Sequence, residues 1–177
     1  VWGGGGGGGD WEELRGMEVC DFIADVACQA NESDWNGQSV SNLLNGLARC
    51  REFGWVSESA LQRVIVRLGD IVVRTPIYMF EGVYDAQNIA IVANALARCD
   101  CFNQSLMTHL ALVAQQMHPD SFDVQSISNL ANAYAKLDPY SDVTRGLLEF
   151  IAVVGLFLEV SDGFTPQAVS NLANAYA

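Results

Sequence analysis

A segment of about forty residues recurs four times along the chain, and this repeat limits the possible folds more than any other feature of the sequence. The two clearest copies, FDVQSISNLANAYA at 122–135 and FTPQAVSNLANAYA at 164–177, share ten of fourteen residues. Weaker copies begin at Trp35 and Tyr84. Four aligned glutamines, Gln38, Gln87, Gln125 and Gln167, lie 49, 38 and 42 residues apart. This period is typical of stacked two-helix units.

Each copy carries the same signals for the start of a helix. A residue that favours the N-cap position, where a side-chain oxygen accepts a backbone N–H, occupies one place in all four copies: Asn36, Asp85, Asp123 and Thr165. Pro166 follows the last cap, at a position where a missing N–H costs nothing. An aromatic residue precedes each cap and a Val or Ile follows five positions later, which is the spacing of a hydrophobic staple. The pairs are Trp35 and Val40, Tyr84 and Ile89, Phe122 and Ile127, and Phe164 and Val169.

The segments between the copies have apolar residues at helical spacing. They predict helices over 57–74, 103–117 and 141–160, and a further helix over about 11–30, capped by Asp10, precedes the first copy. The apolar stretch 147–160 is shorter than the roughly 20 residues that span a bilayer, so we expect a buried core helix there and no membrane association. The predicted fold is all-α: an α-solenoid of stacked two-helix repeats, with about three complete pairs and a flanking helix at each end.

This organisation divides the chain into three parts. They are a Gly-rich flexible lead-in at 1–9, an acidic N-terminal helix at 10–34, and helical repeats at 35–177, with units at about 35–83, 84–121, 122–163 and a truncated 164–177. Because the chain begins at Val1 and soon runs into seven consecutive glycines, we expect a fragment of a longer protein in which the repeats continue beyond Ala177.

The charge of the chain opposes functions that need a basic surface. Nine Lys and Arg against 21 Asp and Glu give a net charge of −12, whereas nucleic-acid-binding proteins gain affinity by neutralising phosphates. The excess is uneven, because eight acids and one base lie in 1–34. Five cysteines are an odd number in a chain that is long enough to form a core, which favours a reducing intracellular compartment over a disulfide framework.

The repeated helix has an apolar face and, opposite it, a polar stripe. Copy by copy, the stripe consists of Gln38, Asn42 and Asn45; Gln87 and Asn94; Gln125, Asn129 and Asn132; and Gln167, Asn171 and Asn174, with Ile91 as the exception. These amides either bond neighbouring helices in a structural ladder or line a groove that reads nucleobases. Residues that read a base sequence should vary from copy to copy, and these amides hardly vary. We therefore favour the structural ladder. It predicts that Asn132→Ala lowers the melting temperature more than the RNA affinity.

One position beside the stripe does vary, and its residues are better candidates for RNA readout: Ser39, Asn88, Ser126 and Ala168. A basic residue is shared by the last turn of the first three copies: Arg49, Arg98 and Lys136. Two interpretations of these cations stand equally. They form a track for RNA phosphates, or they complement the negative end of each helix dipole.

The helix QSISNLANAYAKL at 125–137 resembles the octotricopeptide and heptatricopeptide repeats, which are similar to the helical repeats of FAST kinase-like and RAP-domain proteins. The resemblance covers about 35–177 and rests on the caps, amides and alanines of the four copies. It implies an organellar RNA-binding protein of the mitochondrial matrix or a plastid, acting in RNA processing, stability, translation or ribosome assembly. The implied partners are single-stranded organellar RNA and, secondarily, ribonucleoprotein or ribosomal proteins. A nuclease-like RAP domain is not contained in these residues, so the resemblance implies RNA binding without catalysis.

The competing hypothesis is a protein-interaction scaffold or a structural subunit of a ribonucleoprotein particle, which the acidic charge supports. Nothing in the sequence indicates an enzyme, a metal, a cofactor or a small-molecule substrate. The glycines at 3–9 lack the preceding strand of a phosphate-binding loop. Cys99 and Cys101 lack a second ligand pair for zinc and are expected to be small buried residues, and His109 and His118 lack partners for acid–base catalysis.

Overall fold

The computed structural model describes residues 8–77, 83–159 and 162–177, with side chains from Arg15 onward. These residues are all-helical, as the sequence predicts, and contain no strand. The α-helices are α1 (Gly8–Gln29), α2 (Gly37–Glu52), α3 (Glu58–Arg74), α4 (Ala86–Arg98), α5 (Gln104–Gln116), α6 (Val124–Leu137), α7 (Asp142–Phe157) and α8 (Pro166–Ala175). Two 3₁₀ turns, η1 (Glu32–Asp34) and η3 (Pro119–Ser121), lie between them.

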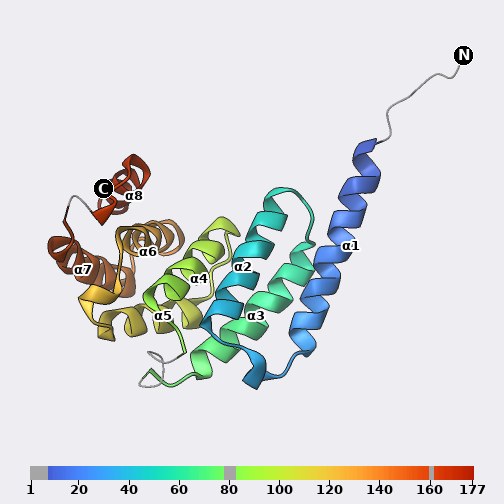
Figure 1. Ribbon diagram of the computed structural model, residues 1–177, viewed down its shortest axis with the longest axis horizontal. Helices are drawn as coiled ribbons and strands as arrows, with labels where there is room; N and C mark the ends of the chain where they lie inside the picture. The colour runs from blue at the N-terminus through green and yellow to red at the C-terminus, as the bar shows by residue number, and fades with distance from the viewer. Residues whose placement is uncertain (1–7, 78–82, 160–161) are drawn as a thin grey trace, which may run out of the picture.

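The helices pack in two rows (Figure 1). The four repeat copies α2, α4, α6 and α8 lie side by side in one row, which we call the A row. Helices α1, α3, α5 and α7 form the second, or B, row. The rows are joined by contacts of α2 with α3, α4 with α5, and α6 with α7. Each of the first three repeat units therefore contributes one helix to each row, and the fourth copy contributes α8 to the A row.

All four predicted A-row caps are confirmed. The side chains of Asn36, Asp85, Asp123 and Thr165 each accept a hydrogen bond from the backbone N–H three residues later, at 2.9, 2.6, 2.7 and 3.1 Å. Ser57, Asn103 and Ser141 cap α3, α5 and α7 in the same way. The cap chemistry of the sequence thus fixes where seven of the described helices begin.

The staple residues lie in the core in three of the four copies. Val40, Ile89 and Ile127 are at most 1% exposed, whereas Val169 is 50% exposed. The difference arises because α8 packs mainly against α6, without the second-row helix that covers each earlier A-row helix. The apolar face of α8 is therefore partly open among the described residues.

Two sequence predictions are wrong at helix ends, and a third is wrong about burial. Helix α1 begins at Gly8. The chain is therefore already helical two residues before Asp10, and Asp10 is not the cap of this helix. Helix α7 ends at Phe157, with Leu158 as its C-cap, rather than at 160. The apolar stretch is not wholly buried, because α7 turns only one face inward: Ile151 is buried, while Phe157 is 67% exposed. Residues 1–7 of the expected lead-in and 160–161 lie outside the described residues. No described helix combines the length and apolar character that crossing a membrane requires.

The acidic helix α1 docks on α3 through small side chains and charged contacts. Its inner face buries Cys20, Ala24 and Ala27. Asp21 Oδ1 accepts a hydrogen bond from the backbone N–H of Ser57 at 2.9 Å, and Asp25 pairs with Arg63 at 2.6 Å. Val19, Phe22, Ile23 and Val26 face outward, at 41–68% exposure. The acids of this segment therefore neutralise arginines of α3 as well as adding negative charge.

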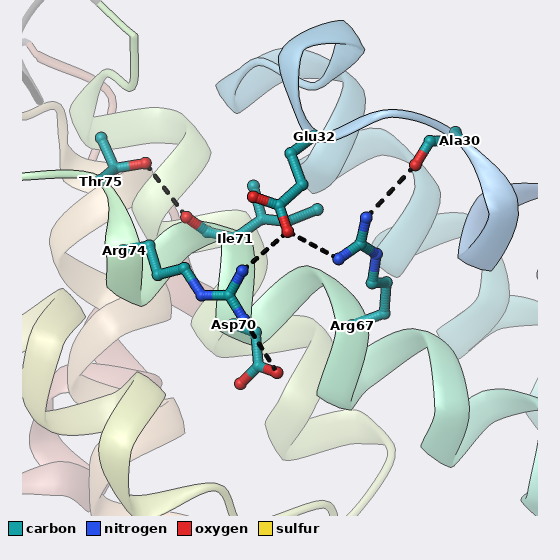
Figure 2. Close-up of polar contacts among 7 residues, drawn as sticks. All are labelled: Ala30, Glu32, Arg67, Asp70, Ile71, Arg74 and Thr75. Carbon is teal, nitrogen blue, oxygen red and sulfur yellow. Dashed lines mark hydrogen bonds and ion pairs between the residues drawn. The ribbon is translucent and has the colours of Figure 1, made fainter.

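Glu32 completes this contact (Figure 2). Its Oε1 accepts hydrogen bonds from Arg67 Nη1 at 2.8 Å and Arg74 Nη1 at 2.7 Å, and Arg67 Nη2 also donates to the carbonyl of Ala30 at 3.4 Å. The hydrogen bond from Arg67, assisted by Arg74, lowers the pKa of the Glu32 carboxyl below its usual 4.5. The turn after α1 is thereby held on α3.

We predict opposite effects for two glycines of α2. A Cβ on Gly37 would lie 2.6 Å from the carbonyl of Val83 and 2.4 Å from the side-chain oxygen of Asn88, so Gly37→Ala should destabilise the fold by about 1–3 kcal/mol. A Cβ on Gly46 meets nothing within 4 Å, so Gly46→Ala should stabilise it by about 0.5–1 kcal/mol. Urea unfolding of both variants measures this, and equal effects would contradict the packing at Gly37.

A second prediction concerns pH. Because the folded-state pKa of Glu32 lies below the unfolded value, its ion pairs contribute stability above about pH 4.5 and lose it as the pH falls through the folded-state pKa. Glu32→Gln should therefore lower the melting temperature at neutral pH and have little effect in acid. Asp34→Asn, in the same turn and exposed, is the control and should have little effect at either pH. A Glu32→Gln deficit that persists unchanged in acid would rule out the charge contribution.

Candidate nucleic-acid interface

The predicted polar stripes become one continuous surface, which we call the amide face. It consists of Gln38, Asn42, Asn45, Gln87, Asn94, Gln125, Asn129, Asn132, Gln167, Asn171 and Asn174, all of them exposed or half-buried. Within each helix these residues follow a spacing of four and then three, so they lie on one side. Because the A-row helices are neighbours in space, the four stripes lie next to one another.

The amides do not form the hydrogen-bonded ladder that the sequence favours. Within the described residues, Asn45 is the one member of the amide face whose side chain makes a hydrogen bond, accepting from Arg98 Nη1 at 3.0 Å. The reason is visible in α4, where Ala90 and Ala95 flank the stripe and are buried. Neighbouring helices meet through such small residues, and the stripe stands at the outer edge of their contact. The remaining amides are free to bond a ligand.

The variable positions beside the stripe have a different role from the readout that the sequence suggests. They are the third residues of the A-row helices, where Ser39 Oγ accepts from the backbone N–H of Asn36 at 2.9 Å and Asn88 Oδ1 accepts from that of Asp85 at 3.4 Å. Asn88, Ser126 and Ala168 are 9%, 3% and 7% exposed. Burial and capping withdraw them from a ligand. The capping-box spacing of three residues could have revealed this role in the sequence.

The shared basic residues connect consecutive A-row helices. Arg98, in the last turn of α4, pairs with Glu52 of α2 at 2.8 Å as well as bonding Asn45. Lys136, in the last turn of α6, donates to the carbonyl of Ala97 at the end of α4. Both cations therefore bond the neighbouring helix, a role that neither interpretation from the sequence included. Arg49 is exposed and has no bonding partner among the described residues.

Hollows occur where consecutive A-row helices meet near their N-termini. A cavity of about 320 Å³ between α6 and α8 is lined by Gln125, Asn129, Gln167 and Asn171 among others. A second, of about 420 Å³, lies beside the start of α2 and is lined by Trp35, Asn36, Gln38, Val83 and Asn88. Between α4 and α6 the space is only about 30 Å³, roughly the volume of one water molecule. Two of the three hollows can therefore admit a planar group beside an amide.

The electrostatics of the face are close to neutral or negative. Six of the nine basic residues form ion pairs with carboxylates: Arg51, Arg63, Arg67, Arg74, Arg98 and Arg145. The caps Asp85 and Asp123 add negative charge at the N-terminal edge of the face. Phosphate neutralisation at this surface is therefore limited to Arg49 and Lys136.

The cysteines and histidines that the sequence analysis considered lie away from the amide face. Cys99 is buried and Cys101 half-buried at the end of α4, joined by Asp100, whose φ of 51° places it in the left-handed region. Burial raises the pKa of the Cys99 thiol to about 11. Across the described ranges, no cluster of three or more His, Cys, Asp or Glu has the arrangement to hold a metal ion.

Comparisons of the chain with protein-family models, with curated proteins and with solved structures found no match. The amide face itself is thus the basis for assigning a function. Each amide offers a donor and an acceptor, and the repeat presents these at regular intervals along one row of helices.

We predict that Asn132→Ala lowers the stability less than Arg98→Ala does. A hydrogen-bonded ladder of amides would give the opposite order. Asn132→Ala removes a half-buried, unbonded amide and should change stability by less than about 0.5 kcal/mol. Arg98→Ala removes the bonds to Glu52 and Asn45 and should cost about 0.5–1.5 kcal/mol, with Arg49→Ala as the neutral control. Thermal unfolding compares the three, and a larger loss for Asn132→Ala would restore the ladder.

Proposed function

We propose that this chain is an α-solenoid that binds single-stranded RNA along its amide face and catalyses no reaction. The two rows of consecutive helices support the architecture, because each unit contacts chiefly its neighbours. The observation that carries the binding proposal is the repetition of solvent-accessible, unbonded amides at equivalent places in four helices.

The chemistry of these amides suits unpaired bases. Asn and Gln can donate and accept at once, as the Watson–Crick and Hoogsteen edges of a base require, and single-stranded RNA leaves those edges accessible. The cavities beside Gln38 and between Gln125 and Gln167 have room for a planar ring next to an amide. An RNA strand that crosses the A row would meet one such site at each junction between neighbouring helices. The narrow hollow between α4 and α6 would have to widen to accept a base.

The cellular setting follows from the repeat resemblance. The resemblance supports the mitochondrial matrix or a plastid as the location of the proposed activity, and RNA processing, stability, translation or ribosome assembly as its process. Ribonucleoprotein or ribosomal proteins are the accompanying partners in this proposal. The proposed role needs no cofactor and no small-molecule substrate.

The charge distribution supports a second candidate, a protein-interaction scaffold. The net charge is −12, and six basic side chains are already engaged with carboxylates, so a basic or neutral peptide would meet less repulsion than RNA. The same amides can bond an extended peptide backbone. A structural subunit of a ribonucleoprotein particle would use both kinds of contact.

The test is fluorescence anisotropy with pooled single-stranded RNA, titrated with the chain at about 50 and 200 mM salt. We expect binding whose salt dependence is shallow, because Arg49 and Lys136 are the A-row cations that form no ion pair and can contact phosphates. The double variant Asn129→Ala/Asn171→Ala, at the α6–α8 cavity, should weaken binding about tenfold or more without changing the melting temperature.

The matched control is Gln62→Ala/Gln116→Ala, which removes two exposed amides of the B row. It should bind as the wild type does. Equal weakening by both double variants would exclude the amide face as the RNA site. Absence of binding at either salt would reject RNA and leave the scaffold as the better proposal.

A further inference from the structure

The hollows along the A row differ widely in size. The first hollow, beside the start of α2 and reaching Asn88 of α4, has a volume of about 420 Å³, and the last hollow, between α6 and α8, has about 320 Å³. The middle hollow, between α4 and α6, has only about 30 Å³, which is close to the size of one water molecule. The amide face is therefore interrupted at its middle junction.

Ile91 accounts for much of this interruption. It lines the middle hollow and occupies the repeat position that is an asparagine in the other three A-row helices. Those asparagines are Asn42, Asn129 and Asn171. A β-branched side chain on a helix has one strongly preferred χ1 rotamer and carries no hydrogen-bonding group. Ile91 therefore neither turns aside easily nor bonds the edge of a base.

The middle hollow also carries a charge. Its lining includes Asp123, whose carboxylate caps α6 by accepting the backbone N–H of Ser126 at 2.7 Å. The caps that line the first and last hollows, Asn36 and Thr165, are neutral, and the other described residues of those two linings are uncharged as well. A carboxylate repels phosphates and the acceptor atoms of a base. Space, bonding capacity and charge thus all oppose a nucleotide at the middle junction.

The first and last hollows each offer a means of binding a base. Trp35 lines the first hollow and is half-buried, whereas its repeat equivalents Tyr84 and Phe122 are only 2% and 3% exposed. A base can stack on the accessible part of the Trp35 ring beside the amide of Gln38. In the last hollow, amides from both α6 and α8 converge on the same space.

We propose that the chain binds single-stranded RNA at two separate sites, the first and last hollows, and that Ile91 keeps the junction between them closed, so that the nucleotides crossing it are not read. This inference rests on the proposed RNA binding. It adds the form of RNA that the amide face selects, which is two read segments joined by an unread one.

The A row sets the distance between the two sites. Neighbouring packed helices lie about 8–10 Å apart, so hollows separated by two such spacings lie roughly 16–20 Å apart. A stacked strand advances about 3.4 Å per nucleotide and would need about five or six steps to cover this distance. Once one segment is bound, the linked second segment binds intramolecularly, and this gain is lost if the linker cannot span the sites.

The test compares, by fluorescence anisotropy, a random-sequence single-stranded RNA of about ten nucleotides with the same RNA carrying about four abasic nucleotides at its centre. Abasic nucleotides keep their phosphates, so only the bases are removed. We expect the two RNAs to bind within about twofold of each other. Extending the abasic block through one flank should weaken binding about tenfold or more, because one of the two sites is then empty.

Protein variants test the role of the middle junction. Gln87→Ala removes an exposed amide that lines only the middle hollow and should leave RNA binding unchanged, whereas Asn171→Ala, in the last hollow, should weaken it. Ile91→Asn restores the amide of the repeat. It should make the central bases count, so that this variant binds the centrally abasic RNA about threefold or more weaker than the complete RNA. Melting temperatures confirm that each variant is folded.

The outcomes separate this inference from the proposed function. If the central abasic block weakens binding as much as the loss of a flank does, the two-site inference is wrong and RNA binding stands. Equal losses for Gln87→Ala and Asn171→Ala would have the same meaning, and an Ile91→Asn variant that still ignores the central bases would remove Ile91 from this role. If the complete RNA does not bind, the proposed function fails and this inference fails with it.

Discussion

The structure depends on the side-chain cap that begins each A-row helix. Asn36, Asp85, Asp123 and Thr165 each satisfy a backbone N–H that would otherwise lack a partner, and they fix the rotation at which the helix starts. Near the first two caps the copies are also linked, since Gly37 donates its N–H to the carbonyl of Val83 and Asn88 donates to Ser41. Because the four A-row helices begin at equivalent residues, equivalent side chains point in the same direction in each helix. The apolar faces therefore all point inward and the amides all point outward.

The positions of most elements could be predicted from the sequence, because caps and apolar spacing are local signals. The four A-row caps were predicted in this way, and the predicted starts of α3, α5 and α7 coincide with the caps Ser57, Asn103 and Ser141, whereas the early start of α1 at Gly8 has no such signal. What the amides contact could not be predicted, because a helical wheel gives the direction of Asn129 but not the distance to the next helix. For the same reason the bond from Lys136 to Ala97 became visible only with the neighbouring helix in place. The capping role of Ser39 is local, and its spacing of three residues from Asn36 could have revealed it.

The ion pairs that hold the helices together engage most of the basic side chains. Ion pairs such as Arg63 with Asp25 and Arg67 with Glu32 hold α1 on α3, and Arg98 with Glu52 joins α4 to α2. These arginines are committed to packing, which leaves the amide face with little positive charge. On the proposed function, a ligand of this face would be selected by directional hydrogen bonds and by shape more than by long-range attraction. That distinguishes it from the basic grooves of most nucleic-acid-binding proteins.

The most direct test of this account is an NMR titration that follows the side-chain NH₂ signals of Asn and Gln as single-stranded RNA is added. The account predicts shifts for amide-face residues such as Asn42, Asn129 and Asn171, and none for Gln62 or for the capping residue Asn103, both of which belong to the B row. Shifts confined to the B row, or spread equally over both rows, would contradict the assignment of the amide face as the binding surface.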